Sequence, residues 1–184
     1  MKTIKKGTVL LAQPFMEDPN FSRSAVLITD HHKSDGTVGF VLNKRIGTCI
    51  NDLIDDFPEI DSEVYIGGPV GKDTLHYIHD KGDILDNSIS VVEGVYWGGD
   101  YEKLKFLIDT KLIQSRNIKF FLGYSGWSTG QLESELSYGS WMLSQMDANY
   151  AFRQTPKDLW KMITRNKGGH YTVIAEMPKS NHLN

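Results

Sequence analysis

The residues that come nearest to known catalytic chemistry lie in the stretch 121–135, which reads FLGYSGWSTGQLESE. Ser125 sits there between glycines, in an order close to the G-x-S-x-G nucleophile elbow of serine hydrolases. An apolar run enters the stretch and an amphipathic segment leaves it, so we expect a strand, a tight turn that exposes Ser125, and a helix. Trp127 replaces the last glycine of the motif, and the only later histidines are His170 and His182. A serine-dependent hydrolase using Ser125 is therefore one alternative, and a structural turn is the plainer interpretation.

A second glycine-rich turn, over residues 67–69, is followed by a lysine and partly matches a phosphate-binding loop. Ile66 stands where that loop needs a glycine, and Asp73 follows Lys72 where serine or threonine is required. The segment after it has the pattern of a strand, so no helix N-terminus would face an anion. We interpret it as a turn at which the backbone comes close to a neighbouring chain.

Histidines, carboxylates and cysteine do not form a metal-binding pattern. His76 and His79 would face opposite sides of a strand, because successive strand residues alternate. The carboxylates around Pro58 are typical of a solvated helix end. Cys49 is the only cysteine, which excludes an internal disulfide and a cysteine-based zinc cluster. We expect no cofactor and no metal.

The charge balance argues against a nucleic-acid reader. The formal net charge is −3 and the pI about 6.1, whereas phosphate contacts usually require a basic surface. Arg153, Lys157, Lys161 and Arg165 recur every four residues and would form a basic stripe on a helix. A transcriptional regulator that binds nucleic acid through this stripe is the second alternative. A solvated helix face is the more common reason for such a stripe, since charged residues opposite a buried face are the norm, so direct nucleic-acid binding is not expected.

The length and hydropathy of the chain predict one domain, 1–184, in the cytoplasm. A chain of 184 residues is large enough to bury a core. No apolar run approaches the roughly 18 residues of a membrane span. The apolar run near the N-terminus, 7–13, is too short for a signal-peptide core, so nothing marks export.

Most of the predicted elements are strands. Apolar or alternating segments predict them at 7–13, 24–29, 37–42, 63–66, 75–79, 89–92 and 118–122. Helices are expected after the caps Asp100 and Ser128, and from Thr155-Pro156 to Gly168. The tail Tyr171–Ala175 has a strand-like pattern. Because regular alternation of strand and helix is absent, we favour α+β with a largely antiparallel or mixed sheet.

Several of these segments, in this order, resemble the YqgE/AlgH family of bacterial proteins. The segments that carry the resemblance are 7–14, 18–24, 39–44, 65–70, 122–127, 130–135 and the Trp141 and Phe152–Trp160 regions. The resemblance implies an α+β fold whose bent or bifurcated sheet is mixed, largely antiparallel and partly barrel-like, with surrounding helices. It also brings a transcriptional-regulator label, and no catalytic residues. The tail from Tyr171 departs from the family pattern.

The leading hypothesis is a non-enzymatic, regulatory protein that binds a small ligand or a protein partner. Its candidate site combines the polar and aromatic residues near the glycine-rich turns. These residues are Asn43, Gly67, Gly68, Pro69, Tyr124, Ser125, Trp127 and Gln131. The polar groups would orient a ligand and the rings would give it apolar contact. The alternative is that Gln131 only caps a helix together with Ser128 and that Trp127 belongs to the core.

Overall fold

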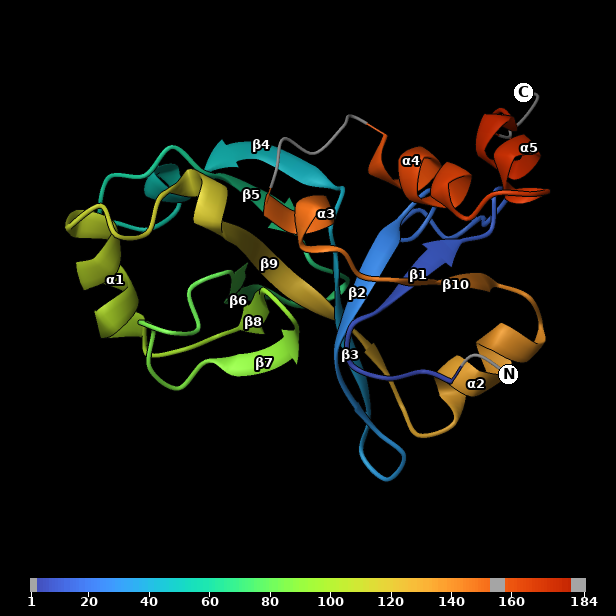
Figure 1. Cartoon of the computed structure of the whole chain (residues 1–184), viewed down its shortest axis with the longest axis horizontal. Helices are drawn as coiled ribbons and strands as arrows, with labels where there is room; N and C mark the ends of the chain where they lie inside the picture. Colours follow the sequence, from blue (N-terminus) through green and yellow to red (C-terminus); the bar gives the residue numbers. More distant parts are fainter. Residues whose placement is uncertain (1–2, 153–157, 180–184) are drawn as a thin grey trace.

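A computed structural model describes residues 3–152 and 158–179. Its strands are β1 (Thr8–Ala12), β2 (Ala25–His32), β3 (Gly36–Val41), β4 (Arg45–Cys49), β5 (Glu63–Ile66), β6 (Val70–His79), β7 (Ile89–Val92), β8 (Val95–Trp97), β9 (Ile118–Trp127) and β10 (Trp141–Gln145). They form one curled sheet in the order β10-β1-β2-β3-β9-β6-β8-β7, with β4 and β5 on a branch (Figure 1). All pairings are antiparallel except that of β5 with β9. The predicted mixed, bifurcated α+β fold is confirmed.

The strand β9 joins the two parts of the sheet. Its first half pairs with β5 and β6, whereas Ser125–Trp127 pair with β3 (Figure 1). Gly123 lies between the halves with a φ of 67°, a conformation in which most side chains would be strained. The prediction that the strand ends at Leu122 was therefore wrong. Hydrogen bonding to β3, a segment distant in sequence, extends the strand by five residues.

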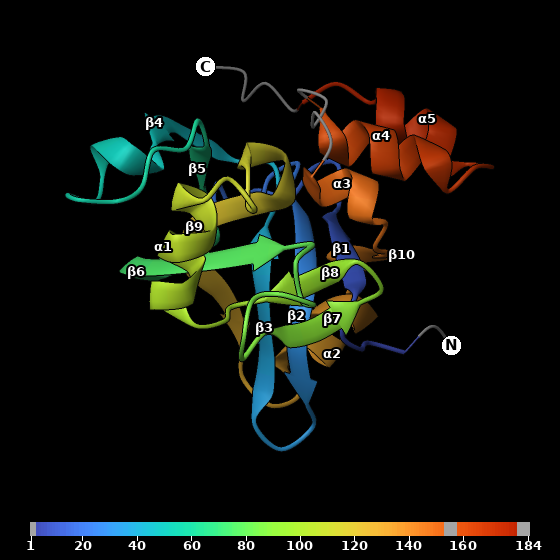
Figure 2. The ribbon, with the colours of Figure 1, turned by 60° about the vertical axis from the view of Figure 1, so that its left-hand side comes forward.

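Five helices of the described residues cover this sheet: α1 (Tyr101–Asp109), α2 (Gln131–Ser137), α3 (Ala148–Phe152), α4 (Leu159–Asn166) and α5 (Tyr171–Glu176). Figures 1 and 2 show α1 beside the β5–β8 part of the sheet, and α4 and α5 together above β1 and β2 in both views. Within the described ranges, buried apolar side chains form three clusters. One contains Trp160 of α4 with Leu27 and Phe40 and extends to Ile78 of β6, so it spans both parts of the sheet. The second contains Leu104 of α1 with Phe120, and the third contains Leu132 of α2 with Trp141.

Local capping explains where several helices begin and end. The Asp100 carboxylate accepts a hydrogen bond of 2.7 Å from the Lys103 backbone N–H, as predicted. Asp158 caps α4 in the same way, accepting from the Lys161 N–H at 3.1 Å. Gly168, with a φ of 72°, follows the end of α4. The predicted helix start at Thr155-Pro156 lies outside the described residues, as do His182, Arg153 and Lys157.

The tail is helical, which corrects the strand expected at Tyr171–Ala175. Residues Tyr171–Glu176 form α5, which packs along α4. Ala175 is buried, and the Glu176 carboxylate pairs with both Lys161 and Arg165 of α4. These contacts between neighbouring helices override the β propensity of the segment. No helix in the described ranges is long and apolar enough to cross a membrane.

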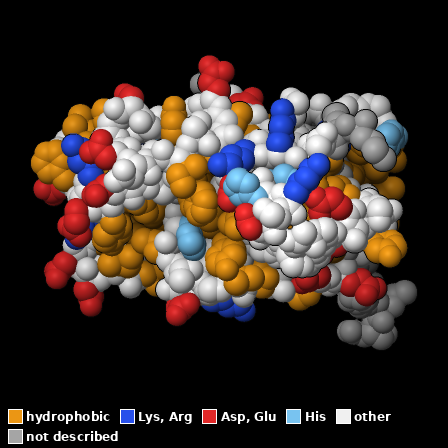
Figure 3. All heavy atoms as spheres, turned by 90° about the horizontal axis from the view of Figure 1, so that it is seen from below, with side chains coloured by type: hydrophobic (Ala, Val, Ile, Leu, Met, Phe, Trp, Pro, Cys, Tyr) orange, Lys and Arg blue, Asp and Glu red, His pale blue; other side chains and the backbone are white. Residues whose placement is uncertain are grey.

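Hydrophobic side chains also reach the surface. Figure 3 shows groups of them among charged side chains on the face seen from below. Phe106 and Leu112, near the end of α1, are each more than half exposed. More than half of the surface of an ordinary folded protein is apolar, so this exposure alone identifies no binding site.

Candidate functional site

Ser125 lies in a closed part of the sheet. Its side chain is fully buried, so the expected exposure was wrong. Its hydroxyl donates a hydrogen bond of 2.9 Å to the Gly67 carbonyl, which also accepts from the Val41 N–H at 2.9 Å. No histidine within the described ranges hydrogen-bonds to this hydroxyl. The arrangement ties the 67–69 turn to β9 and does not resemble an activated nucleophile.

The glycines of the 67–69 turn allow this close contact. A Cβ atom on Gly67 would lie 2.2 Å from the Gly123 carbonyl oxygen. One on Gly68 would lie 2.3 Å from the backbone of Tyr124. The segment that the turn approaches is thus β9 of the same chain. Pro69, half-buried, leads from this contact into β6.

Trp127 and Gln131 belong to a different cluster, which is centred on the Glu135 carboxylate of α2. One carboxylate oxygen accepts from the indole N–H groups of Trp127 at 3.0 Å and Trp141 at 2.7 Å. The other accepts from the Gln131 amide at 3.0 Å. The Gln131 oxygen accepts from the Ser128 N–H at 3.0 Å, which is half of the expected capping box, although Gly130 is the N-cap. Both tryptophans are buried, so the cluster anchors α2 to the sheet.

Asn43 occupies a third place. Its side-chain oxygen accepts from the Ala25 N–H at 3.0 Å, and its amide donates to the Arg23 carbonyl at 2.8 Å. It therefore joins the end of β3 to the start of β2. The structure brings the 67–69 turn, Tyr124 and Ser125 together, and it places Trp127 with Gln131 elsewhere and Asn43 apart from both groups.

A cleft of about 900 Å³ lies at the opposite, N-terminal end of β9. The β4–β5 pair, the start of β9 and α3 line it, and Figure 1 shows α3 close to β5 and β9. Its polar lining comprises Arg45, Asp61, Ser62, Glu63, Asp80, Ser115, Arg116, Asn117, Lys119 and Asn149. Tyr65 and Phe152 add aromatic surface. Small molecules bind in large concave sites of this kind, and polar residues outnumber apolar ones in the lining of this one.

Lys119 is the most unusual of these residues. Its side chain is only 4% exposed, although it carries an amine. The Nζ atom donates to the Leu42 carbonyl at 3.2 Å and lies 4.1 Å from the centroid of the Tyr65 ring. Burial, with a smaller contribution from the positive charge of Arg45, lowers the pKa of this amine to about 7. Near neutral pH the amine is therefore poised between its charged and neutral forms.

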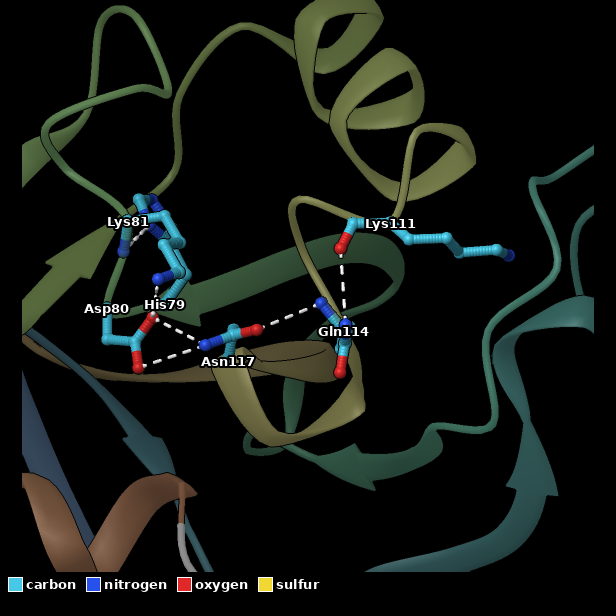
Figure 4. Close-up of polar contacts among 6 residues, drawn as sticks. All are labelled: His79, Asp80, Lys81, Lys111, Gln114 and Asn117. Carbon is cyan, nitrogen blue, oxygen red and sulfur yellow. Dashed lines mark hydrogen bonds and ion pairs between the residues drawn. The ribbon is translucent and has the colours of Figure 1, made fainter.

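The rim of the cleft is fixed by hydrogen bonds around Asn117 (Figure 4). Its amide donates to both oxygens of Asp80, at 3.1 and 3.3 Å, and its oxygen accepts from the Gln114 N–H at 3.0 Å. Figure 4 shows Asn117 between Asp80 and Gln114, which come from different segments. These bonds hold the turn before β9 and thereby position Lys119. At the other wall, Arg45 pairs with Glu63 at 3.0 Å.

Sequence reasoning missed this cleft. One signal was present, since Lys119 is the only charged residue in the apolar run Ile118–Leu122. A charged residue in a buried strand lowers stability unless it is paired, so such a residue usually has a partner or a function.

The chain resembles known proteins over nearly its full length. A family model described as AlgH-like matches residues 9–172. The chain belongs to the AlgH-like family. A UPF0301 protein of Chlorobaculum tepidum is 40% identical over 181 residues, which cover 98% of this chain and 96% of that protein. The corresponding protein of Cytophaga hutchinsonii is 37% identical, covering 98% of this chain and all of that protein.

Two solved structures share the AlgH-like fold. The solution structure of AlgH from Pseudomonas aeruginosa superposes with a TM-score of 0.74 at 24% identity, covering 98% of this chain and 100% of that chain. A crystal structure of a Corynebacterium diphtheriae protein gives 0.80 at 22% identity, covering 96% and 94%. At these identities the likeness concerns the fold alone.

Proposed function

We propose that the protein binds a small anionic metabolite, one carrying a carboxylate or phosphate, in the cleft at the start of β9. The observation that carries the proposal is the buried Lys119 amine in the wall of that cleft. An anion near this amine would stabilise its charged form, which burial otherwise disfavours. The exposed Arg116 adds positive charge at the rim, and Tyr65 and Phe152 add apolar contact.

This proposal retains the non-enzymatic, regulatory role in the cytoplasm and moves its site. Burial of Ser125 argues against the hydrolase alternative. Lys161 and Arg165 are both paired with Glu176, which leaves less of the basic stripe for nucleic-acid phosphates. The acidic Asp61, Glu63 and Asp80 around the cleft argue against a long polyanion such as a nucleic acid.

A thermal-shift screen of metabolites tests the proposal. A true ligand should raise the melting temperature of the wild type and lose that effect in Lys119→Met, which keeps the apolar stem and removes the charge. The matched control is Lys33→Met, at the exposed tip of the β2–β3 hairpin. The double variant Ser125→Ala/Gln131→Ala should still respond, because both residues lie outside the cleft. A ligand whose effect is unchanged in Lys119→Met, yet lost in the double variant, would return the site to the Ser125 region.

Proton uptake gives a second, independent measurement. Because the Lys119 pKa is about 7, an anion that raises it should draw a proton from the buffer on binding near neutral pH. Calorimetry in two buffers of different ionisation enthalpy measures this uptake. Binding with no proton uptake in the wild type would place the anion away from Lys119.

A further inference from the structure

The strand β10 forms one end of the sheet and, among the described residues, pairs with β1 alone. All five of its residues pair with β1 in one continuous register. The strands at the other edges, β4 and β7, each have a register shift in their pairing. Because a regular edge presents an unbroken row of backbone groups, β10 is the edge best suited to accept a further strand.

Backbone bonds at both ends of β10 show which of its residues face β1. Just before the strand, the Gln13 N–H donates to the Ser140 carbonyl at 3.1 Å. Just after it, the Met146 N–H donates to the Gly7 carbonyl at 3.0 Å. The direction of the backbone N–H and C=O groups alternates from residue to residue in an antiparallel pair. The even-numbered residues of β10 therefore face β1, and the odd-numbered residues face away from it.

Leu143 and Gln145 thus present their backbone groups at the outer edge of the sheet. The Leu143 carbonyl accepts a bond of 2.6 Å from Lys167 Nζ, which agrees with this direction because Lys167 directly follows α4. Within residues 3–152 and 158–179, the structure gives no partner to the Leu143 N–H or to either backbone group of Gln145. Gln145 is exposed, so an added strand can reach this edge.

Two hollows lie along this edge, and residues 143–145 line both of them. The first, of about 530 Å³, is completed by Tyr150, Asn166, Lys167 and Tyr171. The second, of about 240 Å³, is completed by Thr3, Lys5 and Thr8. Figure 1 shows α4 above β10 and the N-terminal segment below it, so the hollows lie on opposite sides of the strand. Side chains of an added strand would alternate between these two sides.

The charges around the edge indicate what kind of strand fits. Lys167 lines the first hollow and Lys5 the second, and no carboxylate of the described residues lines either. A second copy of this chain would bring the same two lysines to the edge, so like charges would oppose the pairing of two β10 strands. The charges instead favour a segment that carries acidic side chains.

We propose that β10 binds an extended acidic segment of a partner protein, which adds to the sheet as a further strand beside Leu143 and Gln145. Main-chain hydrogen bonds would supply affinity, and the two hollows would select the side chains. A glutamate of the partner beside Lys167 would attract the amine that otherwise bonds to the Leu143 carbonyl, which leaves that carbonyl for the added strand. This surface is independent of the ligand proposed for the Lys119 cleft, whose lining shares none of these residues.

The test measures the binding of a fluorescein-labelled peptide of alternating valine and glutamate to the full chain by fluorescence anisotropy. We expect saturable binding, and weaker binding when lysine replaces glutamate in the peptide. Two further peptides carry N-methyl groups on the valine amides or on the glutamate amides. Because an added strand pairs through one of its edges, one of these two peptides should bind about tenfold more weakly or worse, and the other should change less.

Variants of the protein test the same edge. Gln145→Pro removes an outward N–H and places the ring in the way of an added strand, while the bonds to β1 remain because Gln145 faces away from it. Binding should weaken about tenfold or more in Gln145→Pro and should not weaken in Gln145→Ala, which removes only the side chain. Lys167→Gln should weaken binding about two- to fivefold, whereas Lys33→Gln, at the tip of the β2–β3 hairpin, should leave it unchanged.

The proposal would be overturned if the unmethylated peptide showed no saturable binding, or if neither methylated peptide bound more weakly. Binding that a folded Gln145→Pro retains in full would also overturn it. If circular dichroism shows that Gln145→Pro is unfolded, the methylated peptides with the wild type decide. A wild type that dimerises in sedimentation velocity, and that Gln145→Pro makes monomeric, would assign the edge to a second copy of the chain and not to an acidic partner.

Discussion

The two halves of β9 present opposite kinds of surface. In the first half, Lys119 faces a cleft of about 900 Å³, with its amine buried and its pKa lowered. In the second half, Gly123–Trp127 are pressed between β3 and the 67–69 turn, and Ser125 has no exposed surface. The chemically suggestive motif therefore lies at the closed end of the strand, and the unusual amine lies at the open end.

The difference shows what closely packed glycines and a buried lysine each indicate about the molecule. Gly67 and Gly68 are required where two stretches of backbone come closer than a Cβ atom permits. They report contact within the molecule. Lys119, in contrast, keeps a charge in a place where an apolar side chain would be more stable. Such a residue is a better indicator of function than a glycine turn.

The strongest test of the closed end is Gly68→Ala. The new Cβ would lie about 2.3 Å from the Tyr124 backbone, so the 67–69 turn must separate from β9. We expect a loss of about 3 kcal/mol or more in the free energy of unfolding, measured by urea denaturation.

The matched control for Gly68→Ala is Gly126→Ala in the same strand. Gly126 is exposed, and the atom nearest to its Cβ would be a ring carbon of Tyr124 at 3.3 Å. The free energy of unfolding of Gly126→Ala should stay within about 1 kcal/mol of that of the wild type. Similar losses in the two variants would mean that the close contact at Gly68 is not what limits substitution.

A smaller loss is expected when the α2 anchor is removed by Glu135→Ala. Two indole N–H groups, of the buried Trp127 and Trp141, would lose their acceptor. We expect a loss of about 2 kcal/mol in the free energy of unfolding. Glu135→Gln keeps one acceptor oxygen and should lose less, and Glu133→Ala on the exposed side of α2 should lose least. Equal stability of Glu135→Ala and Glu133→Ala would contradict the anchoring role.

The features that the sequence predicted correctly depend on residues that are close together in the chain. The Asp100 cap, the end of α4 near Gly168 and most strands follow from local patterns, and all are present in the structure. The resemblance to the family supplied the bifurcated sheet, which local patterns could not. The strand-like tail failed because α5 is stabilised by its contacts with α4.

The candidate site was harder to predict because its properties come from distant segments. Lys119 is buried by Tyr65 and bonded to the carbonyl of Leu42, which is 77 residues away in the chain. Nothing near Lys119 in the sequence shows that these groups meet it. The same holds for Ser125, whose burial depends on pairing with β3 and on Gly67. A motif that looks exposed in isolation can thus be covered by a strand that the local sequence does not reveal.

Ser125→Ala should lower the free energy of unfolding less than Gly68→Ala or Glu135→Ala does. It removes one hydrogen bond to the Gly67 carbonyl, which keeps its bond from the Val41 N–H. We expect a loss of about 1 kcal/mol in the free energy of unfolding. Activated-serine probes should leave the folded wild type unlabelled at Ser125. Labelling at this residue, detected by mass spectrometry, would revive the hydrolase alternative.

At the open end of β9, Lys119→Met should cause no loss of stability at neutral pH. The lost hydrogen bond to Leu42 is offset because methionine no longer requires a buried charge. The sharper measurement is the pH dependence. The Lys119 pKa is about 7 in the folded protein and 10.5 in the reference state, so between these values the unfolded chain binds more protons. This group therefore makes the wild type more stable as the pH rises from about 7 to about 10.

The variant should lack this rise, while contributions from all other lysines cancel in the comparison of the two proteins. This pH range ends near pH 10 because of Tyr77. Its pKa is raised to about 12 in the folded protein, so above pH 10 the unfolded chain loses the tyrosine proton before the folded protein does, and stability falls. Urea denaturation at three or four pH values within this range measures both slopes. Parallel slopes in wild type and Lys119→Met would show that the amine is as well solvated as in the unfolded chain. The first half of β9 would then lack the buried, poorly solvated amine on which the assignment of the ligand site depends.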